Sequence, residues 1–246
     1  MSHRIFLAGA SGAIGQRLAP LLRDAGHHVT GTTRSPAKAA GLRALGVETV
    51  AVLDIFDTQA LSRAVVAAQP DIVIHQLTDL PPALAPHLMA DALVRNARIR
   101  DEGTRNLVQA ALAAGARRLI AQSIAWVYAP GKTPHVESDP IKLEADGSYN
   151  VSIAGVVALE KYTLQSPPLE GVVLRYGQLH GPGTGADAPR GTMPLHVDAA
   201  AHAALLAIDR CAPGIYNITE PNEVVSSDKA RDELGWNADF RLPGLA

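Results

Sequence analysis

Near the N-terminus, a short apolar segment of strand character leads directly into three glycines that are spaced by pairs of residues. Residues 4–8 read RIFLA, then come Gly9, Gly12 and Gly15, and a segment of helical period begins. In this context Gly9 permits a sharp turn, Gly12 lets the backbone approach a pyrophosphate, and Gly15 lets helix and strand pack closely. The amides of the helix N-terminus would then hold the phosphates, although a purely structural turn is the alternative. The residues expected at this dinucleotide loop are Gly9, Ser11, Gly12, Ala13, Ile14 and Gly15.

The rest of the chain alternates short runs rich in Val and Ile with longer segments of helical period. This alternation is typical of βαβ units that build a parallel sheet. We therefore predict the α/β class, with a doubly wound Rossmann-type parallel sheet of about seven strands. The strands are expected at residues 4–8, 28–33, 47–52, 71–77, 117–123, 171–176 and 214–218.

Helical periodicity is clearest at residues 101–114, at 152–165 and after the glycines. In that first helix Ile14 and Leu22 help to form one apolar face. Pro20 lies inside the same helix, where the lost backbone hydrogen bond predicts a kink or an early break.

Composition and charge restrict the class of protein. The chain has 246 residues, a formal charge of −2 and scattered basic residues, which makes nucleic acid an improbable partner. Cys211 is the only cysteine, so the chain has no internal disulfide and fits a reducing compartment. No apolar run reaches the roughly 20 residues of a membrane span, and we expect a cytoplasmic protein without a membrane partner.

Several further segments resemble the short-chain dehydrogenase/reductase superfamily, especially its extended branch of epimerases, dehydratases and reductases. The GxxGxxG spacing of the glycine loop is the first of these features. The others are RDEGTRNLVQAA at 100–111, similar to NxxGTxNLLEAA; QSIAWVY at 122–128, similar to SSxxVYG; LRYGQLHGPG at 174–183; HVDAAAHA at 196–203; and DELGW at 232–236. The resemblance implies one NAD(P)-binding domain over residues 1–246, with a small truncated substrate cap from 178–196 and 216–246.

The end of the second expected strand indicates which dinucleotide is bound. An NAD site usually has an acidic residue there for the ribose hydroxyls. This strand instead ends in Thr32, Thr33 and Arg34, and a guanidinium can receive a 2′-phosphate. We therefore favour NADP(H) over NAD(H), with a solvated surface arginine as the alternative.

Two other strand ends are expected to complete the cofactor site. Asp54 and Ile55 follow the third strand where relatives bracket the adenine, although Asp54 could instead cap the helix that begins near Thr58. Leu77 and Thr78 follow the fourth strand and should lie against the ribose on the nicotinamide side.

The resemblance also implies a catalytic tyrosine, a lysine four residues later and a serine or threonine. Tyr149 stands at the tyrosine position, but Ile153 replaces the lysine and Ile124 the hydroxyl residue, with Ser123 one residue before it. A tyrosine with an ordinary pKa near 10 is a poor acid at neutral pH. We predict Tyr149 and Ser123 as catalytic residues, while a packing role for Tyr149 stays open.

Tyr128 and His180 are the residues expected to contact substrate, because they fall where α/β sites form. Each also has a structural explanation, as a packing aromatic and as a loop residue. The histidines are too dispersed to predict a metal site.

The sequence favours an NADP(H)-dependent oxidoreductase that reduces a carbonyl of a small, largely apolar molecule. The short stretch 184–195 leaves little surface for a nucleotide sugar. An epimerase or dehydratase acting on nucleotide sugars and a non-catalytic NADP(H)-sensing regulator remain as alternatives. A homodimer through residues 88–114 and 152–165 is expected only by analogy.

Overall fold

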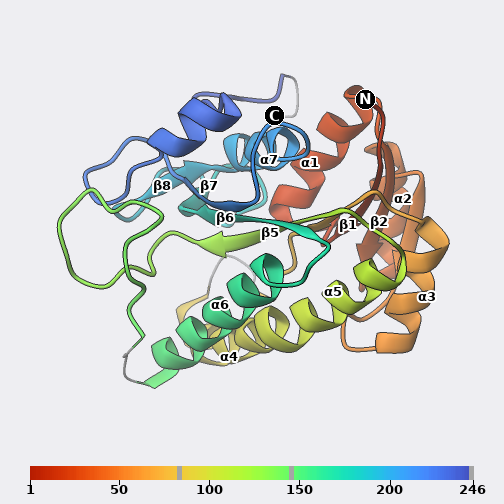
Figure 1. Ribbon diagram of the computed structural model, residues 1–246, viewed down its shortest axis with the longest axis horizontal. Coiled ribbons are helices and arrows are strands. Elements are labelled where there is room, and N and C mark those ends of the chain that lie inside the picture. Colours follow the sequence, from red (N-terminus) through yellow and green to blue (C-terminus); the bar gives the residue numbers. More distant parts are fainter. Residues whose placement is uncertain (82–84, 144–146, 244–246) are drawn as a thin grey trace.

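A computed structural model shows a seven-stranded, fully parallel sheet in the order β3-β2-β1-β4-β5-β6-β9 (Figure 1). The structure describes residues 1–81, 85–143 and 147–243, and at 86 and 147–149 it describes the backbone alone. The strands are β1 (Arg4–Ala8), β2 (His28–Thr33), β3 (Thr49–Val52), β4 (Ile72–His75), β5 (Arg118–Ile124), β6 (Glu170–Tyr176) and β9 (Gly214–Ile218). The predicted fold class and strand set are confirmed, with differences of one or two residues at several ends.

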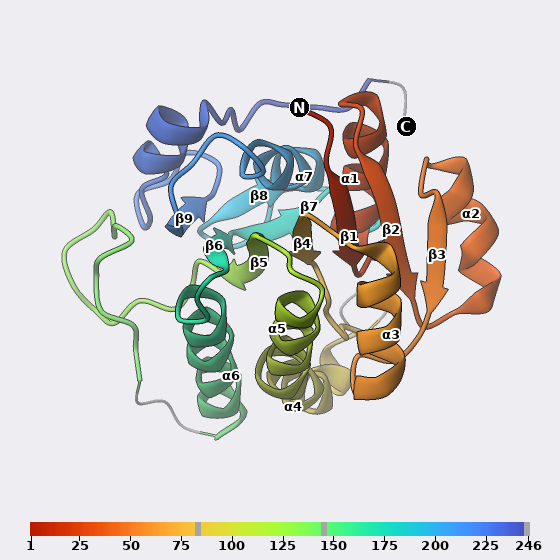
Figure 2. The same cartoon turned by 45° about the vertical axis from the view of Figure 1, so that its right-hand side comes forward.

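Helices cover both faces of the sheet (Figure 2). Strand β1 has apolar side chains on both faces, and both must be covered. Ile5 and Leu7 pack in the core cluster of one face, and Phe6 and Ala8 pack in the core cluster of the other. On the first face lie α1 (Ala13–Asp24), α2 (Ala39–Ala44) and α7 (Val197–Leu206). On the second lie α3 (Thr58–Ala68), α4 (Met89–Arg98), α5 (Thr104–Ala113) and α6 (Gly147–Leu164).

Two of these helices differ from the sequence expectation. Helix α1 continues through Pro20 to Asp24, so the expected early break is absent. The helix expected to begin at residue 101 is α5, which begins at Thr104. A π-helical turn, η4 (Ile99–Gly103), joins it to the preceding helix α4. A π turn changes the direction of the side chains that it carries, and such turns are frequent at functional sites.

The expected cap segments form small structures beyond the main sheet. Strands β7 (Gln178–His180) and β8 (Pro194–His196) pair in a two-stranded sheet, and η5 (Ala230–Leu234) is a second π-helical turn. Since β9 extends to Ile218, residues 216–218 of the expected cap belong to the main sheet. Short 3-10 turns, η1 (Pro36–Lys38) and η3 (Pro86–Leu88), complete the described elements.

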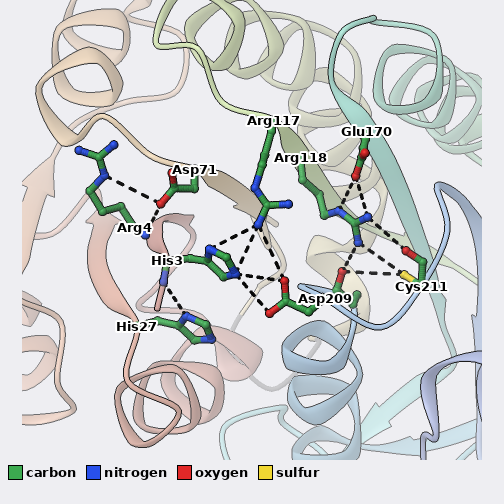
Figure 3. Close-up of polar contacts among 10 residues, drawn as sticks. His3, Arg4, His27, Asp71, Arg117, Arg118, Glu170, Asp209 and Cys211 are labelled. Carbon is green, nitrogen blue, oxygen red and sulfur yellow. Dashed lines mark hydrogen bonds and ion pairs between the residues drawn. The ribbon is translucent and has the colours of Figure 1, made fainter. Parts of the chain in front are cut away.

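The amino-terminal edge of the sheet is held by polar contacts (Figure 3). His3 Nε2 lies 3.0 Å from Asp209 Oδ1, and Arg117 approaches the same carboxylate at 3.8 Å. Arg118 is buried and donates to Glu170 Oε2 at 2.7 Å. These contacts join the amino-terminal ends of β1 and β5 to the segment after α7 and to Glu170 of β6.

Candidate active site

A cleft of about 860 Å³ opens at the carboxyl ends of the strands. The strand order reverses between β1 and β4, because chain connections leave these neighbours toward opposite edges of the sheet. In open α/β sheets, ligands bind in the crevice at this switch point. The cleft volume lies within the range of small-molecule and cofactor sites.

The glycine loop forms one wall of this cleft with the geometry expected from its spacing. Gly9 has a φ of +92°, and a Cβ there would lie 2.6 Å from the Gln76 carbonyl oxygen. A Cβ on Gly15 would collide with the carbonyl oxygens of Gly9 and Ala10, so this glycine serves close packing and does not line the cleft. Gly12 lines the cleft, and the nearest atom to a Cβ there is Gly9 O at 3.4 Å.

The open space beside Gly12 is the observation that fits a pyrophosphate. Gly12 caps α1 without a side-chain hydrogen bond, so the amides of the first turn have no side-chain acceptor at the cap. Such amides and the helix dipole favour an anion. Ser11, Ala13 and Ile14 also line the cleft, and Ser11 Oγ lies 3.0 Å from Thr33 Oγ1.

Arg34 lines the cleft at the end of β2, and its side chain is already paired with a carboxylate. Its Nη2 donates to Asp79 Oδ1 at 2.9 Å, and Arg95 Nε donates to the other carboxylate oxygen at 2.9 Å. Burial would raise the pKa of Asp79, but the hydrogen bonds and charges of Arg34 and Arg95 outweigh it and lower that pKa. Lys38, which sequence reasoning missed, lines the same part of the cleft.

Asp54 and Ile55 both line the cleft, as expected for residues at the adenine end. The alternative interpretation of Asp54 as the helix cap is wrong. Asp57 is the N-cap of α3 and accepts from Ala60 N at 2.9 Å. Asp54 Oδ1 accepts only from the nearby amide of Phe56, at 3.0 Å, among the described residues.

The end of β4 is fixed by a buried histidine. The Nδ1 atom of His75 accepts from Leu77 N at 3.2 Å, so Nε2 carries the hydrogen and donates to Thr104 Oγ1 at 3.1 Å. Burial, with the charge of Arg100, lowers the pKa of His75 to about 4 and keeps the ring neutral. This arrangement presents Leu77 and Thr78 to the cleft, where both were expected.

Ser123 lines the cleft, but its hydroxyl hydrogen is committed to a buried network. Ser123 Oγ donates to Glu160 Oε1 at 2.8 Å, and Arg175 binds both oxygens of Glu160, at 2.9 and 2.7 Å. Burial would lower the pKa of Arg175, yet the hydrogen bonds and charge of Glu160 raise it above its ordinary value. Ser123 can therefore accept a hydrogen bond from a ligand while it donates to Glu160.

Tyr128 and His180, the residues expected to contact substrate, do not line the cleft. The Tyr128 hydroxyl donates to Asn217 Oδ1 at 2.6 Å and accepts from Arg175 Nη1 at 2.9 Å. His180 is buried, with Nε2 2.9 Å from Glu220 Oε1. Their polar groups are used in contacts between segments, and their contact with a substrate stays a prediction.

The catalytic prediction for Tyr149 falls at the edge of what the structure describes. Its backbone lies in the first turn of α6, but its side chain is outside the described residues. One turn further along α6, Ser152 lines the cleft and its Oγ accepts from Arg100 Nη1 at 3.0 Å. Arg100 reaches the cleft from η4, and sequence reasoning did not predict it as a site residue.

Within the described parts of the chain, no three histidine, cysteine or acidic side chains are grouped so that they could hold a metal ion. None of the helices described there is long and apolar enough to cross a bilayer.

Comparison with known proteins agrees with this geometry. The sequence model of the NAD dependent epimerase/dehydratase family matches residues 5–218. This chain belongs to that family. A Streptomyces protein named 3-diazoavenalumate denitrifying reductase is 40% identical over 88% of this chain and 76% of its own length. A UDP-N-acetyl-alpha-D-glucosaminuronate decarboxylase of Bacillus cytotoxicus is 25% identical, over 95% of this chain and 74% of its own.

Solved structures of family members share the fold. UDP-glucose 4-epimerase of Thermotoga maritima with UDP-glucose superposes with a TM-score of 0.77 at 16% identity, covering 98% of this chain and 94% of that one. The Thermus thermophilus UDP-glucose 4-epimerase complex with NAD gives 0.74 at 19% identity, covering 98% and 95%. The family match and the relative named as a reductase show that this epimerase/dehydratase family member is an NAD(P)-dependent enzyme.

This epimerase/dehydratase family member departs from the extended-branch pattern in the half of the cleft beyond the cofactor loop. Ile124 and Ile153, at the positions of the hydroxyl residue and the lysine, belong to one apolar cluster with Val127 and Val156. Ile153 is buried and does not line the cleft, whereas Ile124 does. Two polar positions have thus become one hydrophobic contact region, and Arg100 stands at the first position of the NxxGT segment, where the pattern has asparagine.

Proposed function

We propose that this protein is an NADPH-dependent reductase whose acceptor is a small molecule that needs no acid from the enzyme. The observation that carries the proposal is the contrast between the two halves of the cleft. The glycine loop keeps the space for a pyrophosphate at Gly12. The family's hydroxyl and lysine positions, Ile124 and Ile153, are packed into an apolar cluster.

The preference for NADPH is supported by the charges at the end of β2. Arg34 and Lys38 line that corner, and the strand itself ends in threonines. Asp79 neutralises part of this charge, but it is shared between Arg34 and Arg95. The corner therefore keeps positive charge for a 2′-phosphate.

The chemistry of the acceptor follows from the missing lysine, without which the family's tyrosine is a poor acid. Reduction of a carbonyl leaves an alkoxide that must be protonated, which is the task of the family's tyrosine and lysine. Replacement of a diazo group by hydrogen leaves no alkoxide. The relative at 40% identity is named as a denitrifying reductase of a diazo compound, which supports a diazo acceptor for this chain as well.

When bound, NADPH supplies a hydride that forms a C–H bond on the carbon bearing the N₂ group, while the C–N bond breaks and its electron pair leaves with N₂. The chain's own residues orient the acceptor. Ser123 can accept a hydrogen bond from it, and the neutral His75 holds the end of β4 in place. Ile124 adds apolar surface to this region of the cleft.

Carbonyl reduction is the second candidate, and one observation favours it. Tyr149 keeps the family's tyrosine position, and its backbone lies in the first turn of α6, three residues before the cleft residue Ser152. If Tyr149 donates a proton, Tyr149→Phe should reduce turnover by about tenfold or more.

The test uses purified protein, NADPH and two acceptors, 3-carboxybenzenediazonium and 3-carboxybenzaldehyde. The proposal expects NADPH oxidation and N₂ release in equal amounts with the diazonium, and less than about a threefold change in turnover for Tyr149→Phe. Turnover of the aldehyde alone, lost in Tyr149→Phe, would establish the second candidate instead.

A further inference from the structure

Arg100 contributes a positive charge to the cleft without an ion-pair partner among the described residues. Its Nη1 donates to Ser152 Oγ at 3.0 Å and approaches the Ser152 carbonyl at 3.5 Å. Within the described part of the chain, no acceptor lies within hydrogen-bond distance of its Nε or Nη2. A guanidinium offers five N–H donors, so most of its capacity remains for a ligand.

The nearby charges do not neutralise Arg100. Glu160 is the carboxylate that influences it, but the oxygens of Glu160 already accept from Ser123 and, at both positions, from Arg175. The charges of Glu160 and Arg175 cancel, and His75 is neutral. This end of the cleft therefore keeps one uncompensated positive charge.

The position of Arg100 separates this charge from the phosphates of the cofactor. Those phosphates are expected at the glycine loop, near Gly12, whereas Arg100 comes from η4 and lies against Ser152 of α6. The π turn sets the direction of the side chain into the cleft. Burial lowers the pKa of Arg100 to about 10, with the charge of Glu160 acting in the opposite sense, so the side chain stays charged at neutral pH.

We propose that Arg100 binds a carboxylate of the substrate and so selects small organic acids as acceptors. The two oxygens of a carboxylate would accept two parallel N–H hydrogen bonds from the guanidinium, which is the geometry that arginine forms best with this group. This inference rests on the proposed reductase function and names its substrate class. Arg100 is a specificity-determining residue in this account, and Ser152 positions it.

The experiment measures binding of two unreactive probes of similar shape, benzoate and benzamide, to the NADP⁺-loaded protein. Tryptophan fluorescence reports binding, since Trp126 lines the cleft. We expect the unaltered protein to bind benzoate about tenfold more tightly than benzamide. Arg100→Gln keeps a donor for Ser152 but loses the charge, and should bring the two affinities within about threefold. Arg100→Lys should keep part of the preference.

Arg105→Gln is the matched control. Arg105 is exposed on α5, and its substitution changes the net charge by the same amount as Arg100→Gln does. It should behave as the unaltered protein does. Equal affinity for both probes in the unaltered protein, or a preference that persists in Arg100→Gln, would overturn the carboxylate assignment. NADP⁺ binding, measured first in each variant, shows that the cofactor site is intact. Failure of the reductase proposal is a different result, namely no oxidation of NADPH by the unaltered protein with the diazonium acceptor.

Discussion

Arg34 Nη2 donates to Asp79 Oδ1 at 2.9 Å, which joins the end of β2 to the segment after β4 across 45 positions of the chain. Arg95 contacts the other oxygen of the same carboxylate but does not line the cleft. The two arginines therefore share a partner and differ in their access to a bound dinucleotide.

This difference gives a matched pair of variants for the cofactor preference. Arg34→Ala should weaken NADPH binding by about tenfold or more and NADH binding by less than about threefold, because only NADPH carries the 2′-phosphate. Arg95→Ala should weaken NADPH binding less than Arg34→Ala does, because Arg95 acts only through the shared Asp79 and does not line the cleft. Calorimetric titration of both cofactors measures these values, and equal losses for NADPH and NADH in Arg34→Ala would refute the 2′-phosphate assignment.

The glycine loop allows cofactor binding and folding to be tested separately. A methyl group at Gly12 would enter open space in the cleft, and its φ of −81° suits alanine. Gly12→Ala should keep the free energy of unfolding within about 0.5 kcal/mol and weaken dinucleotide binding by about tenfold or more.

Gly15→Ala should mainly lower the stability of the fold, whereas Gly12→Ala should mainly weaken dinucleotide binding. Its methyl group would collide with the carbonyl oxygens of Gly9 and Ala10, which costs roughly 1–3 kcal/mol of stability. Urea unfolding without cofactor measures this loss. Unchanged stability in Gly15→Ala, or a destabilised Gly12→Ala with normal binding, would contradict the roles given to these glycines.

His75 predicts a specific dependence of stability on pH. Its pKa is about 4 in the folded protein and 6.5 as the ordinary value, so the unfolded chain binds more protons between these pH values. The contribution of His75 to the free energy of unfolding is fully present above pH 6.5. It decreases by roughly 3 kcal/mol as the pH falls to 4.

Comparison with His75→Gln isolates this contribution. The variant should lose less stability between pH 6.5 and pH 4, since glutamine does not titrate. Burial also lowers the pKa of His27, His196 and His202, but those residues remain in both proteins. Parallel curves for the two proteins in urea unfolding at a series of pH values would show that His75 is not held neutral.

Local patterns were sufficient to predict the sheet and the cofactor half of the cleft. The alternation of short Val- and Ile-rich runs gave β1, β2 and β9 with the observed bounds. The glycine spacing predicted a close approach at Gly12 and a packing contact at Gly15, and the atoms nearest to these two glycines belong to residues close in sequence. Arg34, Asp54 and Thr78 lie within three residues of the ends of β2, β3 and β4. Parallel strands bring their carboxyl ends to one edge.

The other half of the cleft depends on contacts that no local pattern contains. Ser123 meets Glu160 across 37 positions, and Arg100 meets Ser152 across 52. The RDEGT segment was recognised, but its π turn, which directs Arg100, has no clear periodic signal. Nor does a local pattern show that the hydroxyl of Tyr128 finds its partners in β6 and β9.

The central claim, that the cleft transfers hydride from a bound nicotinamide to the carbon that loses N₂, is tested most directly by isotope transfer. Protein supplied with NADPH deuterated at C4 of the nicotinamide, from one face at a time, is mixed with 3-carboxybenzenediazonium in ordinary water. The account predicts benzoate with one deuterium at the former diazo carbon, from one face of the cofactor only. Benzoate that contains no deuterium with either cofactor, while N₂ is still released, would contradict it.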